Sequence, residues 1–227
     1  MTRNPTQPPK KSSRKSRIIL FSSLGVFAFL FAFCCYIGTL GGNVREIDRG
    51  KAYRSATLTG FSYTGITAAI TGNSLDNVLK KDNIKTVVNL RGGSDSDDWY
   101  HQEVEACKTN GVEHIDFPMS ARKLPPPEVV EGLIKTFDHG KFPILIHCQA
   151  GSDRTGLAST LYKYLESGQS LDDAQRDQLT WRYGHFPISK TRKMDDFFDL
   201  YRKNGNGMDF REWVHTKYPQ LYNSDPQ

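Results

Sequence analysis

The sequence has 227 residues, a formal net charge of +5 and 24% charged residues. With 37% hydrophobic residues, this composition is typical of a folded globular domain and excludes a largely disordered chain. Six of the 30 basic residues fall in the first 17 positions, which hold no acidic residue, so the remainder has 24 basic against 25 acidic residues. The remainder is therefore close to neutral, which excludes a broad basic face for nucleic acid.

An uncharged apolar stretch at residues 18–40 follows this basic tail directly. It is longer than the stretch of about 20 apolar residues that spans the hydrocarbon core of a bilayer, so it predicts a single transmembrane anchor. A cleaved signal peptide is the alternative, but its apolar region is shorter and ends at small residues. Cationic flanks stay on the cytoplasmic side. We therefore expect residues 1–17 in the cytoplasm and a catalytic domain, residues 43–227, outside it, in the periplasm if the organism is bacterial.

Beyond residue 43, strand and helix patterns alternate along the chain. Two short strand patterns around residues 48–51 predict a hairpin. Apolar runs predict buried strands at residues 85–90 and 143–147, and a further strand is predicted at residues 112–117. Helical spacing predicts helices at residues 75–81, 99–110, 127–138, 155–167, 171–179, 190–204 and 209–217. The alternation predicts an α/β domain with a mainly parallel central sheet flanked by helices, and a helical C-terminal part.

The segment His147–Gly156 reads HCQAGSDRTG and lies between a predicted strand and a predicted helix. Ligands of open α/β sheets bind beyond the carboxyl ends of the strands, and the N–H groups at a helix N-terminus favour an anion. Gly151 permits a close turn of the backbone, and Arg154 offers a planar fork to two phosphate oxygens. The segment therefore predicts a phosphate-binding loop that is formed by Gln149, Ala150, Gly151, Ser152, Asp153 and Arg154.

Cys148 stands at the start of this loop. The thiolate is the reactive form of cysteine, and a helix N-terminus together with a guanidinium lowers the thiol pKa below about 8.5. The same loop thus ionises the sulfur and holds the phosphorus atom in front of it. We predict that Cys148 is the nucleophile and Arg154 the phosphate clamp. The hydroxyl of Thr155 can donate a hydrogen bond to the sulfur and assist its departure.

With these residues the chain resembles the protein tyrosine and dual-specificity phosphatase superfamily, whose signature reads HCxxGxxRTG. The resemblance covers residues 44–215 and includes looser blocks at Tyr53–Ala56, Thr86–Arg91, Phe117–Arg122 and Tyr183–Phe186. The chain looks most like small bacterial dual-specificity-like phosphatases that are exported or membrane-anchored. The resemblance implies hydrolysis in two steps through a phosphocysteine intermediate, with no metal and no cofactor.

The general acid is where the sequence departs from the family pattern. Family members usually protonate the leaving oxygen with an Asp on a mobile loop before the cysteine, but residues 119–127 hold no carboxylate. Asp153 is one candidate, because myotubularin-like relatives carry an Asp there that is thought to serve as acid. Its alternative role is to brace the loop by pairing with Arg154 or a nearby lysine. Asp116, at a strand end, is the other candidate, and its alternative is a solvated or paired strand residue.

We therefore expect a protein tyrosine or dual-specificity phosphatase, with phosphorylated protein as substrate and Arg122 and Lys123 as candidate contacts to substrate or lid. A phosphoinositide phosphatase is the first alternative. The Asp before Arg154 favours it weakly, whereas Ser152 disfavours it, since lipid-cleaving relatives often place lysine there. A catalytically dead phosphopeptide-binding module is the second alternative, against which the intact Cys148 and Arg154 argue.

Overall fold

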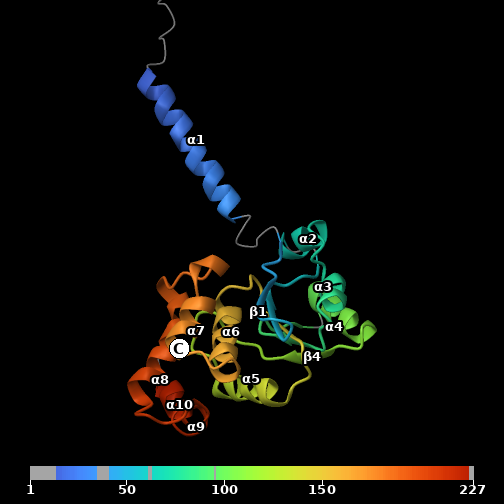
Figure 1. Ribbon diagram of the computed structural model, residues 1–227, viewed down its shortest axis with the longest axis vertical. Helices are drawn as coiled ribbons and strands as arrows, with labels where there is room; N and C mark the ends of the chain where they lie inside the picture. The colour runs from blue at the N-terminus through green and yellow to red at the C-terminus, as the bar shows by residue number, and fades with distance from the viewer. Residues whose placement is uncertain (1–13, 35–40, 61–62, 95, 225–227) are drawn as a thin grey trace, which may run out of the picture.

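The computed structural model describes residues 14–34, 41–60, 63–94 and 96–224 (Figure 1). Its centre is a five-stranded sheet in the order β1-β2-β5-β3-β4. The strands are β1 (Arg45–Asp48), β2 (Ala52–Ser55), β3 (Thr86–Asn89), β4 (Glu113–Asp116) and β5 (Ile144–His147). β1 pairs with β2 antiparallel, as the predicted hairpin requires, and the other three pairs are parallel. The predicted mainly parallel sheet is confirmed.

Neighbouring residues of the buried strands point to opposite faces of the sheet, because side chains in a strand alternate with a period of two. Ile144 and Ile146 of β5 belong to the core cluster on one face, whereas Leu145 between them belongs to the cluster on the other. Every residue of β3 and β5 is buried. This double burial explains why both strands read as continuous apolar runs.

Helices cover both faces of the sheet, and Figure 1 shows α2, α3 and α4 on one side and α5 to α10 on the other. The first group is α2 (Tyr63–Ile70), α3 (Leu75–Lys81) and α4 (Asp98–Thr109). The second group is α5 (Pro127–His139), α6 (Asp153–Glu166), α7 (Leu171–Gln178), α8 (Lys193–Asn204), α9 (Phe210–Thr216) and α10 (Tyr218–Ser224), with short 3-10 turns at Trp181–Tyr183 and Ser189–Arg192. The predicted flanking helices and helical C-terminal part are thus confirmed.

The N-terminal helix α1 covers Arg14–Cys34 and begins with three basic residues in its first four positions. In the part of the chain that the structure describes, no helix is long and apolar enough to cross a membrane. The predicted transmembrane anchor at residues 18–40 is therefore not supported. The described helix reaches Cys34, and residues 35–40 of the predicted anchor lie outside the described part.

Candidate active site

The candidate site lies at the carboxyl end of β5, in the middle of the sheet. Cys148 follows β5 directly, and its side chain is 2% exposed. The chain then forms a tight loop and enters α6 at Asp153. β5 lies between β2 and β3, so segments that follow both neighbours surround the loop. The structure thus places the predicted phosphate loop at the edge of the sheet where α/β proteins bind ligands.

Gly151 is the residue that lets this loop close. Its φ is +69°, in the left-handed region that favours glycine. A Cβ atom added there would lie 2.7 Å from the backbone of Ser55 and Ala56, closer than real contacts allow. The loop therefore packs against the end of β2 with no room for a side chain.

Two buried side chains donate hydrogen bonds to the backbone carbonyls of the loop. Asn43 donates from Nδ2 to the carbonyls of Ala150 at 3.2 Å and Gly151 at 3.1 Å, and Arg54 donates from Nη2 to Gly151 at 2.8 Å. Arg54 also lies 3.9 Å over the ring of Tyr183. Burial lowers the pKa of Arg54 to about 10, which still leaves it protonated at neutral pH. These bonds turn the carbonyls away from the sulfur and add positive charge beneath the loop.

The thiol of Cys148 has a lowered pKa in this surrounding. Burial alone would raise it, but the charge of Arg154 and hydrogen bonds from the Thr155 hydroxyl and from the N–H groups of Thr155 and Gly151 outweigh burial. The Thr155 hydroxyl is buried and has no other hydrogen-bond partner within the described residues, so it is free to serve the sulfur. These contacts therefore favour the thiolate form of Cys148.

The guanidinium of Arg154 forms its hydrogen bonds to the described residues through one nitrogen, Nη1. Its Nη1 donates to the carbonyls of Leu90 at 3.2 Å and Met119 at 3.2 Å, in the segments that follow β3 and β4, and more weakly to Arg91. Nε and Nη2 have no hydrogen bond among the described residues. These two groups form the edge that a bidentate contact to phosphate uses.

Asp153 does not pair with Arg154 or a lysine but with a buried histidine. Its Oδ1 lies 2.7 Å from Nδ1 of His185, and Oδ2 of Asp195 lies 2.9 Å from the other ring nitrogen. Burial alone would lower the pKa of His185, but the bonds to Asp153 and Asp195 raise it to about 9. His185 is thus an imidazolium at neutral pH. Oδ2 of Asp153 has no hydrogen bond within the described residues, and the side chain is 24% exposed.

Asp116 is tied on both oxygens at the end of β4. Asn89 donates to its Oδ1 at 2.7 Å, and the hydroxyl of Tyr100 donates to its Oδ2 at 2.5 Å. β3 separates β4 from β5, so Asp116 lies two strands away from the strand that carries Cys148. Asp116 therefore has the geometry of a paired strand residue.

The buried carboxylate of Glu103 contacts His147, the residue directly before Cys148. Oε1 of Glu103, on α4, lies 2.9 Å from Nε2 of His147 and 3.0 Å from Nε2 of His114, and Glu103 is only 1% exposed. Burial alone would raise the pKa of Glu103, but the two imidazoles lower it to about 2. The contact fixes the ring of His147 and ties α4 to β5.

The two lid candidates are placed differently. Arg122 and Lys123 are both exposed on the segment between β4 and α5. Arg122 lines a pocket of about 540 Å³ together with Asp153, whereas Lys123 does not line it. The other lining residues are Gly184, Phe186, Ile188, Ser189, Lys190 and Thr191. Only Arg122 is therefore brought next to the phosphate loop.

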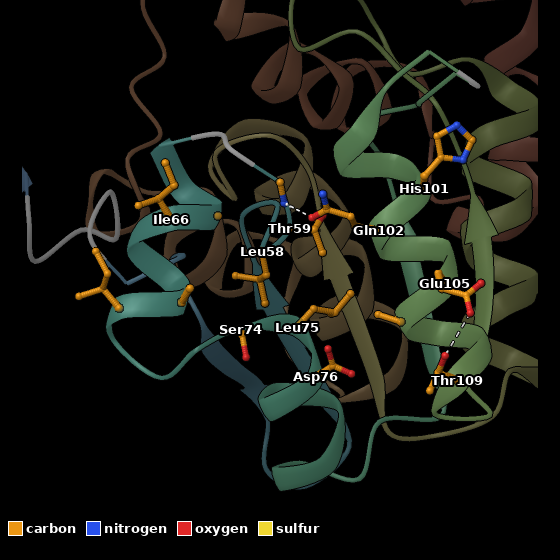
Figure 2. Close-up of a pocket in the computed structure, with 15 residues that line it drawn as sticks. Leu58, Thr59, Ile66, Ser74, Leu75, Asp76, His101, Gln102, Glu105 and Thr109 are labelled. Carbon is orange, nitrogen blue, oxygen red and sulfur yellow. Dashed lines mark hydrogen bonds between the residues drawn. The ribbon is translucent and has the colours of Figure 1, made fainter.

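A larger pocket of about 880 Å³ lies elsewhere, between α2, α3 and α4 (Figure 2). Leu58, Ile66 and Leu75 line its apolar part, and His101 and Glu105 come from α4. None of its lining residues belongs to the phosphate loop. The larger pocket is therefore separate from the phosphate loop and from Cys148.

Four residues of the site had no role in the sequence-based prediction: Asn43, Arg54, Glu103 and His185. Arg54 and His185 lie within the looser blocks Tyr53–Ala56 and Tyr183–Phe186, so the resemblance carried a signal for them. Asn43 and Glu103 have no local signal, because their contacts join segments about 107 and 44 positions apart in the sequence.

Cys148 has a thiol of lowered pKa at the start of a loop that closes on Gly151 and carries Arg154, and this arrangement defines the class of the protein. It is a phosphatase of the cysteine-dependent type. The model of the family described as DSP-PTPase phosphatase fused to NAD+ Kinase matches residues 63–195. This match covers more than half of the chain, and the chain belongs to this family.

Solved structures show the same fold. The chain is similar to Tk-PTP in its active form, with 19% identity and a TM-score of 0.51, over 71% of this chain and 97% of that one. It is also similar to TpbA of P. aeruginosa, solved as a cysteine-to-serine variant in complex with pTyr, with 18% identity and a TM-score of 0.52, over 82% of this chain and 93% of that one. A search of curated proteins found no match.

Proposed function

We propose that the chain is a protein tyrosine or dual-specificity phosphatase that works through a phosphocysteine intermediate. The observation that carries the proposal is the placement of Cys148 and Arg154 on one tight loop between β5 and α6, where the charge of Arg154 helps to lower the pKa of the thiol. The TpbA variant with a similar fold was solved with pTyr, which supports phosphotyrosine as one substrate.

The reaction takes two steps. In the first, Sγ of Cys148 attacks phosphorus, the phosphorus–oxygen ester bond breaks, and the leaving oxygen takes a proton from the general acid. In the second, water attacks phosphorus, the phosphorus–sulfur bond breaks, and the water proton returns to the same carboxylate. Nε and Nη2 of Arg154 bind two equatorial oxygens throughout, where they stabilise the charge of the transferring group.

We assign the general acid to Asp153 in preference to Asp116. Oδ2 of Asp153 carries no hydrogen bond in the described part of the protein, and the residue directly precedes Arg154. Both oxygens of Asp116 already accept hydrogen bonds.

A release assay with the full chain tests this function. We expect phosphate release from nitrophenyl phosphate and from phosphotyrosine peptides, less from phosphoserine peptides, and little from phosphoinositide vesicles. Faster release from the vesicles would assign the chain to phosphoinositides instead. Binding of phosphopeptides with no release from any substrate would identify a phosphopeptide-binding module.

A further inference from the structure

The pocket beside Asp153 adjoins the phosphate loop and has a marked chemical character. Arg122 and Lys190 supply cations, and Phe186 and Ile188 supply apolar surface. Because Asp153 begins α6 and directly precedes Arg154, a group in this pocket lies next to a phosphate held in the loop. The pocket is named the Arg122–Lys190 pocket below.

The cations of this pocket have no counterion of their own. Neither Arg122 nor Lys190 forms an ion pair with a carboxylate among the described residues. The one carboxylate in the lining, Asp153, shares the buried imidazolium of His185 with Asp195, so these three groups leave one negative charge against the two cations. The pocket therefore carries unbalanced positive charge, which favours an anionic occupant.

The apolar wall of the pocket is exposed to solvent. Phe186 is 45% exposed and Ile188 is 71% exposed, although both are large apolar residues. Water wets these surfaces poorly, so an occupant with apolar atoms gains free energy by covering them. A small polyhydroxylated phosphate offers no such atoms, whereas the side chains and Cα groups of a peptide do.

We propose that the Arg122–Lys190 pocket binds an acidic side chain of a phosphotyrosine peptide, next to the phosphotyrosine that enters the loop. The inference rests on the proposed function, since it names a preference of the same catalytic site. The preferred substrate is thus a phosphopeptide with a second anionic group close to the scissile phosphate.

The test compares two phosphotyrosine peptides that differ only in the residues flanking phosphotyrosine, Glu on both sides or Gln on both sides. For the full-length protein we expect kcat/KM to be roughly three- to tenfold higher for the Glu peptide, the range of two exposed ion pairs. The preference should shrink as salt is added, because salt screens exposed charges.

The variant Arg122→Gln/Lys190→Gln should hydrolyse both peptides with equal kcat/KM. The matched control is Lys85→Gln/Lys141→Gln, which removes the same charge before β3 and β5, at the far edge of the sheet, and should keep the preference. Equal rates for both peptides in the wild type, or a preference that survives in the pocket variant, would overturn the inference.

Two further activity measurements distinguish a failure of this inference from a failure of the proposed function. Turnover of nitrophenyl phosphate, which has no second anion, reports whether the site is catalytic at all. Its absence in the wild type contradicts the proposed function itself. Inositol bisphosphate turned over faster than the Glu peptide, with dependence on the same two cations, would overturn the assignment to a peptide.

Discussion

Nδ1 of His185 lies 2.7 Å from Oδ1 of Asp153, directly behind the carboxylate that begins α6. Its second ring nitrogen lies 2.9 Å from Asp195 on α8, and Asp195 also accepts a hydrogen bond from Gln175 on α7. One buried imidazolium therefore ties the start of the catalytic helix to the C-terminal helices. The stability of the fold and the geometry of the site both depend on this ring.

Stability should depend on the protonation of His185. Its pKa is raised from 6.5 to about 9 in the folded protein, so the proton on this ring stabilises the fold fully below pH 6.5. The contribution, on the order of a few kcal/mol, falls as the pH rises from 6.5 and is lost once it passes about 9. Urea unfolding at a series of pH values measures this loss in the wild type, and His185→Gln serves as the reference. Curves that run parallel across this window would show that the ring does not hold the proton.

Cys148→Ser should abolish turnover while the fold and phosphate binding remain. A serine hydroxyl is far less acidic than a thiol, so the loop cannot ionise it.

In the wild type, the rate of alkylation by iodoacetamide should rise with a midpoint below pH 9.0, the ordinary value for this thiol. The Arg154→Gln variant should shift that midpoint upward, since it removes the largest favourable charge. An unshifted midpoint would mean that the loop, and not Arg154, ionises the thiol.

Arg154→Lys should lower kcat by orders of magnitude although it keeps the charge. A point ammonium cannot offer the two parallel N–H groups that Nε and Nη2 present. Steady-state kinetics with nitrophenyl phosphate checks this, with Arg176→Lys as a control that should match the wild type, because the Arg176 side chain on α7 is exposed. Activity of the Arg154 variant within a few-fold of wild type would remove Arg154 from the role of clamp.

Asp153→Asn should slow hydrolysis of a phosphopeptide far more than that of nitrophenyl phosphate. Tyrosine and serine oxygens leave as strongly basic anions unless protonated, whereas nitrophenolate leaves without help. The variant should also lose the basic limb of the pH–rate profile. Asp116→Asn should give a mild loss that is equal for both substrates. The reverse pattern would move the general acid to Asp116, and equal losses in both variants would assign the proton to water or to the substrate.

Gly151→Ala should abolish binding of inorganic phosphate as measured by calorimetry. Gly168 provides a matched control, because its φ is +67° but nothing lies within 4 Å of an added Cβ. Both variants should lose about 1–2 kcal/mol of stability from the left-handed backbone. Only Gly151→Ala also clashes with the end of β2. Retained phosphate binding in that variant would show that the loop does not need its close packing.

The parts of the fold and of the candidate site that could be predicted are those whose signal lies in one contiguous segment of the sequence. The apolar runs of β3 and β5 mark buried strands, and the contiguous HCQAGSDRTG segment marks the loop between β5 and α6. The partners of Asp153 could not be predicted in this way. His185 and Asp195 lie 32 and 42 positions further along the chain, and only the packing of α6 against α8 brings them together.

Through Glu103, α4 contacts the strand that leads to Cys148, and the same helix also lines the larger pocket. Its carboxylate anchors His147 on the inner side of the helix, while His101, Gln102 and Glu105 form a wall of the larger pocket (Figure 2). Separating a buried charge from its partner costs about 3–5 kcal/mol, so α4 is not free to slide along the sheet. The wall of the outer pocket is therefore linked through Glu103 to His147, the residue before Cys148, although the pocket is lined by no residue of the phosphate loop.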